Sequence, residues 1–449
     1  MQLNSDFTNK MKELLGDNYV DFENSLNQQS QKAITVNNYR LKDLTFENIA
    51  DFKYKSIPHI SNGYFVDNIG IGSHVLNHLG IIYSQEPSAM YPVEMLDIEE
   101  GDIVLDLCSA PGGKSIQILE KLNGTGLLVA NEVVFNRVKI LYENLNKMGF
   151  NNFVITCSNP KDFENLDFKF DKILVDAPCG GEGMIRKNNF DFASFNNSSI
   201  ETNALRQSSI LNSIKNILKS SGKLVYSTCT YDIRENEQII VNFLKNNLNY
   251  ELLDCPKLND VTVEGVKIPP FNTQYCKRRY PHLFPGEGQF MGVMLKQGQP
   301  ENICNRFYAK GFENIYKKDI EVLRKTFKDV ANISNLNFIK RNDNIYVLPE
   351  NIDMDFKDIN VVTIGTLVGS IQNGTMKIAH EFYHTYGNLF NRKIELSKEQ
   401  VVDYLKGYEI DIEGDTGICV VTHYGINLGG GKISQGRLKN YYPKNLRIN

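Results

Sequence analysis

Between Asp102 and Leu295, short runs of apolar residues alternate with stretches whose apolar residues recur at helical spacing. The apolar runs predict strands at residues 102–107, 126–130, 153–155, 172–175, 223–226 and 290–295. The other stretches predict helices that begin near Lys114, cover 200–219 with an end at Gly222, and cover 235–244. Short buried strands separated by helices are typical of a parallel sheet covered on both faces. We therefore expect an α/β fold with a doubly wound (Rossmann-like) sheet.

The pattern changes on both sides of this region. Helix-like stretches such as 7–15 precede it, and shorter strands with frequent Asn and Gly follow it, as at 344–349. A predicted helix at 397–405 and a strand at 417–421 lie near the C-terminus. The expected organisation is a helical N-terminal domain over 1–95, the doubly wound domain over 96–298, and small β-rich C-terminal domains, of which 299–390 is an accessory domain and 391–449 the last unit.

The composition is that of an ordinary globular protein. The chain has 449 residues, 41% of them hydrophobic, which suffices for about two to four domains with their own cores. Its N-terminal residues lack the basic flank and apolar core of a signal peptide, and no run of about 18 apolar residues follows. The eight cysteines are scattered without a C-x-x-C pair, as is typical of reduced thiols. We expect a cytoplasmic protein without a membrane partner.

The net charge of -4 argues against a general nucleic-acid binder, because phosphate contacts normally need clustered Lys and Arg. The segment 431–449 differs from the rest of the chain, since it has no acidic residue and contains Tyr441 and Tyr442. Its basic residues are Lys432, Arg437, Lys439, Lys444 and Arg447. Such a basic, aromatic face favours contact with a nucleic acid, and a solvated tail without a partner is the alternative.

The glycine-rich turn after the first predicted strand is a candidate ligand-binding loop. It lies at the carboxyl edge of the sheet, where doubly wound folds bind nucleotides, and the following helix presents free N–H groups. Its residues are Cys108, Ser109, Ala110, Pro111, Gly112, Gly113 and Lys114. The end of the turn also matches a P-loop, but that motif requires glycine where Cys108 stands. A cofactor-binding turn is therefore favoured over an NTPase site.

Three polar residues at the ends of later strands complete this candidate site. Glu132 ends the second strand, 19 residues after Gly113, where an acid can accept hydrogen bonds from ribose hydroxyls. Asn159 follows the third strand and is placed to contact an adenine, while Asp176 ends the fourth strand. The alternative for Glu132 is an ordinary strand-end carboxylate. The turn and the three residues together predict one cofactor crevice.

Two cysteines, Cys179 and Cys229, also follow predicted strands, in Asp-Ala-Pro-Cys and Ser-Thr-Cys-Thr. The carboxyl ends of parallel strands meet at one edge of a sheet, so both thiols are expected beside the cofactor crevice. The alternative is a pair of structural cysteines, because free cysteine is among the most buried residue types. Two thiols at one edge instead favour covalent catalysis, in which Lys114, Arg186 or Lys187 could activate a thiolate. The residues alone do not show which thiol attacks.

The segments 106–114, 176–187 and 226–231 resemble the Nop/Sun family of RNA cytosine-5 methyltransferases. The segments 84–90 and 235–237 resemble the family regions that precede the catalytic domain and follow the second cysteine. Near the C-terminus, 428–432 and 436–443 resemble the PUA-like RNA-binding unit of the bacterial ribosomal-RNA branch. Two departures are Gly180, where serine is common, and Asn159, where many members have aspartate.

The resemblance implies methylation of carbon 5 of a cytosine in RNA, with S-adenosylmethionine as the cofactor. It implies that Cys229 forms a covalent bond to carbon 6, that Cys179 helps to release the product, and that Asp176 holds the base. The turn 108–114, Glu132, Asn159 and Asp176 would hold the cofactor. Small-subunit ribosomal RNA is the favoured substrate and transfer RNA the alternative. The N-terminal domain over 1–95 would also bind RNA, and we expect the enzyme to act as a monomer.

A competing motif lies in the accessory region. His380-Glu381-Phe382-Tyr383-His384 matches H-E-x-x-H, in which two histidines one helical turn apart hold zinc and the glutamate activates water. Gly374 and Gly387 leave room for only about three turns of helix, and the third ligand would have to come from elsewhere, for example from Glu399. We therefore expect a chance match and no metal site. A non-catalytic RNA-binding factor, as a third class, would be expected to have lost its motifs, whereas both cysteines are present.

Overall fold

A central sheet organises the chain in the computed structural model, which describes residues 3–67, 69–187, 196–299, 308–328, 330–350, 352, 354–356 and 358–448. Within these residues five neighbouring strands are parallel, in the order β7-β6-β5-β8-β9. They are β5 (Ile103–Asp106), β6 (Leu127–Asn131), β7 (Phe153–Thr156), β8 (Phe170–Asp176) and β9 (Leu218–Thr228). The chain enters at β5, winds outward to β7, and then crosses back to β8. This order confirms the doubly wound fold and places the switch point between β5 and β8.

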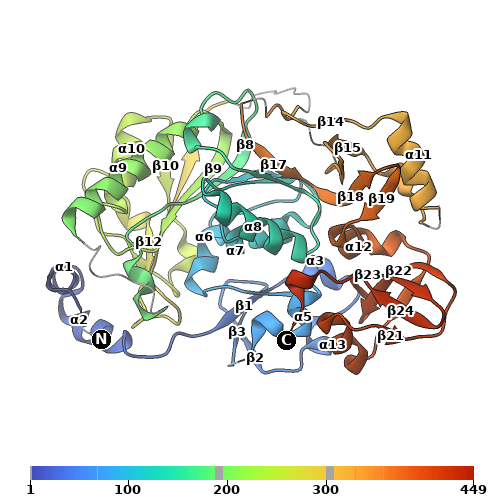
Figure 1. Cartoon of the computed structure of the whole chain (residues 1–449). Helices are drawn as coiled ribbons and strands as arrows, with labels where there is room; N and C mark the ends of the chain where they lie inside the picture. Colours follow the sequence, from blue (N-terminus) through green and yellow to red (C-terminus); the bar gives the residue numbers. More distant parts are fainter. Residues whose placement is uncertain are drawn as a thin grey trace.

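Both faces of the central sheet are covered by helices (Figure 1). Alternate residues along a strand point to opposite faces, so Val104 packs on one face and its neighbour Leu105 on the other. The first face carries α6 (Tyr91–Glu94), α7 (Gly113–Leu122) and α8 (Phe135–Lys147), and the second carries α9 (Asn197–Ile214) and α10 (Glu237–Asn246). The remaining strands of the sheet are β10 (Tyr250–Leu253), β11 (Val263–Glu264), β12 (Lys277–Arg279), β13 (Gln289–Lys296) and β17 (Val361–Ile364).

The end of α9 differs from the sequence prediction. A helix over 200–219 that stops at Gly222 is wrong, because α9 ends at Ile214 and β9 already begins at Leu218. Leu218 pairs with Phe170 of β8, and both side chains are fully buried. Burial against the neighbouring strand therefore overrides the helical spacing. Gly222 lies inside β9, and Ser221 is the residue with positive φ, 65°.

The N-terminal region contains the expected helices and, in addition, a sheet. The helices are α1 (Ser5–Leu15), α2 (Tyr19–Ser25), α3 (Asn38–Leu41), α4 (Phe46–Ile49) and α5 (Val75–His78). The four-stranded antiparallel sheet consists of β1 (Ala33–Val36), β2 (Tyr54–Ser56), β3 (Gly63–Val66) and β4 (Ile82–Ser84). Strands of three or four residues are too short to give a clear alternating pattern.

Two five-stranded sheets follow the central sheet in the chain. The first consists of β14 (Glu313–Asn314), β15 (Phe338–Arg341), β16 (Asn344–Val347), β18 (Thr366–Gln372) and β19 (Thr375–Ile378), with α11 (Lys317–Thr326) and α12 (His380–Tyr386). The second consists of β20 (Lys393–Glu395), β21 (Ile410–Asp411), β22 (Gly417–His423), β23 (Ile426–Ser434) and β24 (Arg437–Asn440), with α13 (Lys398–Lys406). Strand β17 leaves the accessory region and pairs with β7, so this region adds a strand to the central sheet.

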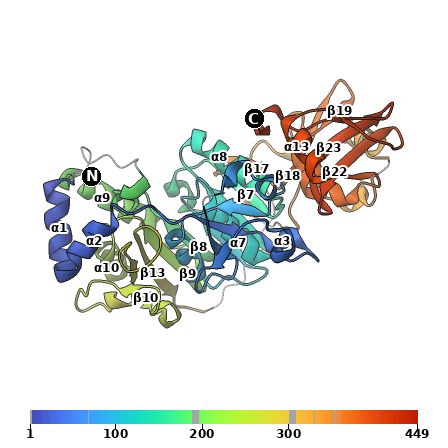
Figure 2. The same ribbon diagram turned by 90° about the horizontal axis from the view of Figure 1, so that it is seen from below.

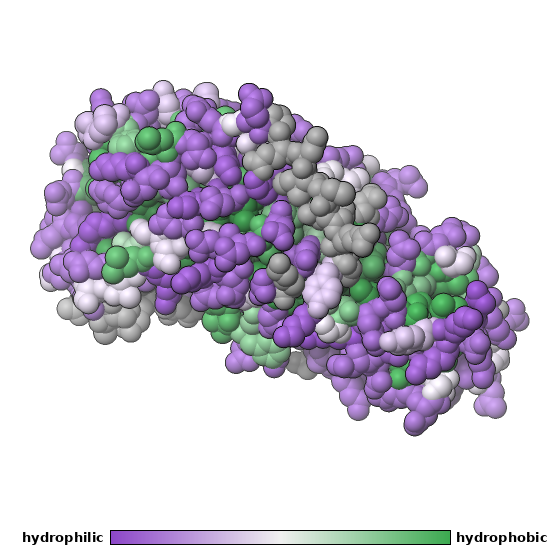
Figure 3. Space-filling view, turned by 90° about the horizontal axis from the view of Figure 1, so that it is seen from above, coloured by the Kyte–Doolittle hydropathy of each residue, from purple (hydrophilic) through white to green (hydrophobic). Residues whose placement is uncertain are grey.

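The molecule is elongated, with α1 at one end and the sheet of β22 and β23 at the other (Figure 2). On the face drawn in Figure 3, hydrophilic side chains cover most of the surface and apolar residues form small groups between them. None of the helices in the described residues combines the length and the apolar character that a membrane crossing needs.

Candidate functional site

The loop between β5 and α7 is held by hydrogen bonds with β6 and α8. The backbone N–H and the hydroxyl of Ser109 donate to the carbonyl of Asn131, at 2.9 and 2.8 Å. Arg137 of α8 donates to the carbonyl of Ala110 at 2.6 Å. Gly112 has a φ of 115°, which favours glycine, and it precedes α7 without a side-chain cap on the first turn. The helix therefore presents uncapped N–H groups at the carboxyl edge of the sheet, which suits a ligand that offers hydrogen-bond acceptors.

Glu132 directly follows β6 and its carboxylate is buried and held. One oxygen accepts from the N–H of Val134 at 2.9 Å, and the other pairs with Arg137 at 2.8 Å. Each oxygen keeps a lone pair for a further donor, as binding of a ribose diol requires. Asn159 is different, since it is exposed and its side-chain oxygen caps the turn Pro160–Phe163 by accepting from the N–H of Lys161 at 3.1 Å. In this conformation Asn159 is used as a cap.

Asp176, at the end of β8, is the centre of a small polar network. The Lys114 ammonium contacts one of its oxygens at 2.8 Å, and the Ser227 hydroxyl donates to the other at 2.7 Å. Burial alone would lower the pKa of Lys114, but the nearby Asp176 carboxylate outweighs this effect and raises it. Burial also raises the pKa of Asp106 to about 7, although Ser115 donates to that carboxylate at 2.6 Å. A fixed positive charge thus lies at the switch point of the sheet.

The two cysteines singled out from the sequence are in contact. Cys179 follows β8 and Cys229 follows β9, and their sulfur atoms are 3.4 Å apart. Both are free thiols and both are partly buried. The hydrogen bond with Cys229, together with burial, raises the pKa of Cys179 well above its ordinary value. Cys179 therefore stays protonated at neutral pH and can donate its S–H to the Cys229 sulfur. The Arg186 guanidinium forms an ion pair with Glu287 at 3.0 Å and not with either thiol.

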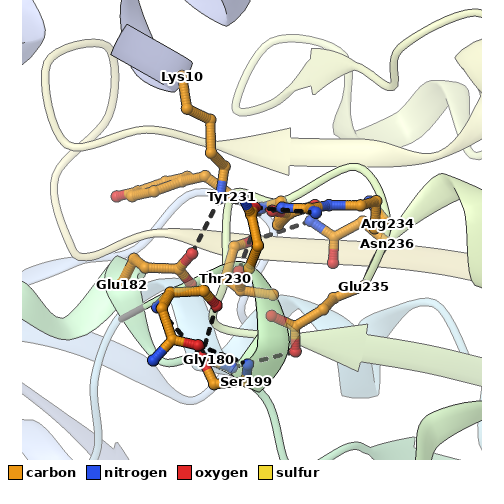
Figure 4. Close-up of polar contacts among 12 residues, drawn as sticks. Lys10, Gly180, Glu182, Ser199, Thr230, Tyr231, Arg234, Glu235 and Asn236 are labelled. Atoms are coloured by element: carbon orange, nitrogen blue, oxygen red, sulfur yellow. Dashed lines mark hydrogen bonds and ion pairs between the residues drawn. The ribbon is translucent and has the colours of Figure 1, made fainter. Parts of the chain in front are cut away.

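Glu235 lies in the segment 235–237, whose family resemblance gave it no role, and it connects the two cysteine loops (Figure 4). Its carboxylate accepts from the N–H of Gly180 at 3.1 Å and from Gln207 of α9 at 2.8 Å. The N–H of Gly183 in turn donates to the carbonyl of Cys229 at 2.8 Å. Burial and then the neighbouring Glu182 raise the pKa of Glu235 to about 7.

Two residues of the H-E-x-x-H motif, Glu381 and His384, contact helix α8. Glu381 accepts a hydrogen bond from Tyr142 of α8 at 3.1 Å, and Nε2 of His384 lies 2.8 Å from the carbonyl of Lys147. Glu399 accepts from the Ser397 hydroxyl at 2.7 Å. Across the described part of the chain, three or more His, Cys, Asp or Glu side chains are nowhere grouped so that they could hold a metal ion. The motif joins α12 to α8, which argues against a peptidase site.

Only some residues of the basic segment near the C-terminus are exposed. Lys432 of β23 and Lys439 of β24 are exposed and lie directly opposite each other. Tyr441 is 40% exposed, whereas Tyr442 is buried and contacts Nδ1 of His78 through its hydroxyl at 2.8 Å. Two adjacent positive charges that face solvent repel each other and suit an anionic partner.

Comparisons with known proteins relate several parts of the chain to ribosomal RNA methyltransferases. Residues 93–295 match 16S rRNA methyltransferase RsmB/F, 3–87 match the N-terminal domain of 16S rRNA methyltransferase RsmF, and 391–448 match the methyltransferase RsmF PUA domain. The chain is 30% identical to ribosomal RNA small subunit methyltransferase F of Shewanella loihica, over 99% of this chain and 96% of that protein. The corresponding protein of Psychromonas ingrahamii is 28% identical over 93% of this chain and 91% of its own length.

A crystal structure of a methyltransferase homologue from Pyrococcus horikoshii has a TM-score of 0.57 and 28% identity, and covers 65% of this chain and 95% of its own. The matches to the catalytic, N-terminal and C-terminal parts thus point to one family. The chain belongs to the RsmB/F family of 16S rRNA methyltransferases, whose methyl donor is S-adenosylmethionine.

Proposed function

We propose that this protein methylates carbon 5 of a cytosine in small-subunit ribosomal RNA, with Cys229 as the nucleophile and Cys179 assisting release. The single observation that carries the proposal is the 3.4 Å contact between the two sulfur atoms at the ends of adjacent parallel strands. The contact lies next to the pair of Lys114 and Asp176, since Ser227, two residues before Cys229, donates to Asp176.

Carbon 5 of cytosine is a poor nucleophile, so the reaction needs covalent activation. In the proposed reaction the Cys229 thiolate bonds to carbon 6, and the electron pair of the carbon 5–carbon 6 double bond moves to carbon 5. Carbon 5 uses this pair to bond to the methyl carbon, whose bond to the sulfonium sulfur of the donor breaks and leaves its electron pair on that sulfur. A base then removes the proton from carbon 5, the double bond returns, and the Cys229 sulfur leaves with the electron pair of its bond to carbon 6.

The residues around this reaction have distinct proposed tasks. The turn 108–114 and Glu132 would hold the cofactor through backbone N–H groups and a carboxylate. When bound, S-adenosylmethionine supplies an electrophilic methyl group. Asp176 still has free lone pairs beside those used by Lys114 and Ser227, so it can accept from the amino group of the cytosine. Protonated Cys179 can donate to the Cys229 sulfur and thereby stabilise it as the leaving thiolate.

The choice of substrate rests on the relatives, whose names specify the small ribosomal subunit. A base whose carbon 6 is attacked has to leave its stack, so we propose that the cytosine is flipped out of the RNA. Lys432 and Lys439 on the C-terminal sheet would bind phosphates at a distance from the reaction. Bisulfite sequencing of 16S rRNA from cells with and without the protein would identify the cytosine.

We also propose that the chain is divided into four domains, of which the first three end at residues 95, 298 and 390.

Replacing the proposed nucleophile tests the reaction directly. Cys229→Ala removes the sulfur that bonds to carbon 6, so methyl transfer to RNA should fall by about 10³-fold or more. Binding of S-adenosylmethionine should remain, because Cys229 lies outside the turn 108–114. The measurements are transfer of labelled methyl groups to 16S rRNA and calorimetric titration with the cofactor. Normal turnover by this variant would refute the covalent mechanism.

Replacing Cys179 tests its role in release. Without the S–H donor the Cys229 sulfur leaves slowly, so Cys179→Ala should accumulate protein that is covalently attached to RNA. Such an adduct survives denaturation and appears as a band of lower mobility in a denaturing gel. The double variant Cys179→Ala/Cys229→Ala is the control, because it has no nucleophile and should give no band. Rapid turnover without an adduct would contradict the assigned role.

A further inference from the structure

The two N-terminal helices pack on the loops that carry the cysteines. Phe7 and Met11 of α1 and Phe22 of α2 share one apolar cluster with Ile185, which follows Cys179, and Tyr231, which follows Cys229. The rings of Phe22 and Tyr231 meet edge to face with their centroids 5.4 Å apart. Helices α1 and α2 therefore pack against the loops that follow both thiols, although they are far from these loops in sequence.

One side chain of α1 reaches both loops at once. The Lys10 ammonium lies 3.0 Å from a carboxylate oxygen of Glu182 (Figure 4) and 2.9 Å from one of Asp232. Glu182 comes three residues after Cys179, and Asp232 three residues after Cys229. Both carboxylates are buried, with 0% and 3% of their side chains exposed, whereas Lys10 is 21% exposed. A single positive charge thus joins the two loops at equivalent positions.

The charges around Lys10 show why its ammonium matters. Asp232 has a second cationic partner, Arg234, at 2.8 Å. Among the described residues, Lys10 is the cation that pairs with Glu182. The second carboxylate oxygen of Glu182 is buried and has no hydrogen-bond partner there. A buried carboxylate that loses its cation either takes up a proton or turns toward water. Either change would alter the loop that begins at Cys179.

We propose that Lys10 is a positioning residue for methyl transfer, because its ammonium ties the Cys179 loop to the Cys229 loop and holds the two thiols in contact. The inference rests on the proposed use of both thiols. It adds a task for the N-terminal helices that is separate from RNA binding. Lys10 itself touches neither thiol and takes no part in bond making.

The test compares three variants of the full-length protein. Lys10→Met keeps the aliphatic stem and removes the charge, and Lys10→Arg keeps the charge. Lys12→Met is the matched control, because Lys12 is an exposed lysine of the same helix whose ammonium lies over the Tyr19 ring, 5.3 Å from its centroid, and not on a cysteine loop. For each variant we would measure kcat and KM with 16S rRNA, the affinity for S-adenosylmethionine, and the rate at which Cys179 and Cys229 form a disulfide.

The disulfide is a readout that does not depend on RNA. Diamide accepts the two electrons and two protons that the thiols lose when their sulfur atoms bond, and peptide mapping by mass spectrometry identifies the Cys179–Cys229 link. Two thiols 3.4 Å apart should react rapidly in the wild-type protein. A variant whose loops have moved apart should react more slowly, whatever happens to its RNA affinity.

For Lys10→Met we expect kcat to fall by about 10- to 100-fold and the disulfide to form at least about 10-fold more slowly, because small misplacements of reacting groups are costly. Affinity for S-adenosylmethionine should stay within about twofold, since the turn 108–114 has no contact with Lys10, and KM for RNA should change little. Lys10→Arg should recover most of both rates, and Lys12→Met should match the wild type.

The proposal is overturned if Lys10→Met retains the wild-type kcat and disulfide rate, or if it loses cofactor binding as well, which would indicate general unfolding. Should Lys10→Met not fold, Lys10→Met/Glu182→Gln takes its place, because this pair leaves no unpaired charge at Glu182. It should fold and bind the cofactor, yet form the disulfide slowly, and rapid formation would equally overturn the proposal. The proposed function is judged separately, on the wild type and Cys229→Ala.

Discussion

Gly180, the residue after the first cysteine, lies between two carboxyl groups. A Cβ atom at this position would be 2.8 Å from one oxygen of Glu182 and 3.0 Å from one of Glu235. Both of these oxygens are buried without a hydrogen-bond partner in the described structure. Burial first, and then the nearby Glu182 carboxylate, raise the pKa of Glu235 to about 7. Gly180, which has no side chain, thus leaves room for two buried carboxyl groups next to Cys179.

Glu235 should therefore make stability depend on pH in the neutral range. Its pKa of about 7 in the folded protein exceeds the ordinary value of 4.5, so its stabilising contribution is complete below pH 4.5 and is lost as pH rises through 7. Glu235→Gln keeps an oxygen for the N–H of Gly180 and cannot ionise. Between pH 5 and pH 8 we expect this variant to lose about 2 kcal/mol less stability than the wild type.

Chemical denaturation at several pH values measures this difference. The control is Glu13→Gln, a change of an exposed glutamate on α1, which should leave the pH dependence as it is in the wild type. Parallel curves for Glu235→Gln and the wild type would show that Glu235 does not titrate in this range.

At the scale of elements, the contact between α12 and β23 explains the run of three glycines in the C-terminal unit. A Cβ atom on Gly430 would lie 2.5 Å from three atoms of the Tyr383 ring. On either side, a Cβ atom would meet the Tyr404 hydroxyl at 2.6 Å from Gly429 and a Leu438 methyl carbon at 2.5 Å from Gly431. The glycines thus let helices and the neighbouring strand lie directly on the backbone of β23. The sequence reveals the glycine run but not the aromatic rings that require it.

Gly430→Ala should consequently destabilise the C-terminal unit. The added methyl group overlaps the Tyr383 ring, and we expect a loss of about 1–3 kcal/mol, as is usual for overpacking. Thermal unfolding of the full chain measures the change. Gly72→Ala is the control, because nothing lies within 4 Å of a Cβ atom at that position. Equal unfolding temperatures for the two variants would contradict the close packing of α12 on β23.

At the scale of the whole molecule, the two ends of the chain share a core. Residues of the N-terminal sheet such as Ile34 and Val36 belong to one apolar cluster with Val421 and Leu428 of the C-terminal sheet. Arg40 is buried at this junction and donates to the carbonyls of Leu79, at 3.1 Å, and Asn427, at 2.7 Å. The C-terminal sheet is therefore held in place beside the N-terminal sheet, and its exposed lysines have a fixed position relative to that sheet.

Replacing Lys432 and Lys439 by glutamine should weaken RNA binding without affecting the chemical step. Each phosphate contact that is lost should make the salt dependence of log Kd shallower by about 0.7 to 0.9. We expect KM to rise while kcat stays near the wild-type value, as measured by methyl transfer at several salt concentrations. Exposed Lys393 and Lys398 of the same unit serve as the control pair. An unchanged salt slope for the variant at 432 and 439 would exclude phosphate contacts at these lysines.

The sequence by itself determined the doubly wound sheet, the position of the turn 108–114 at its carboxyl edge and the proximity of Cys179 and Cys229. The alternation of apolar runs with helical stretches predicts the sheet. The turn and the two cysteines follow predicted strands, and parallel strands bring such ends to one edge. Only the tertiary structure decided the early end of α9, the cap formed by Asn159 and the burial of Tyr442. It also decided the supports of the thiols, because Lys10 meets Glu182 across 172 residues and Glu235 meets Gly180 across 55. A single lysine or glutamate carries no periodic signal, so packing alone selects its partner.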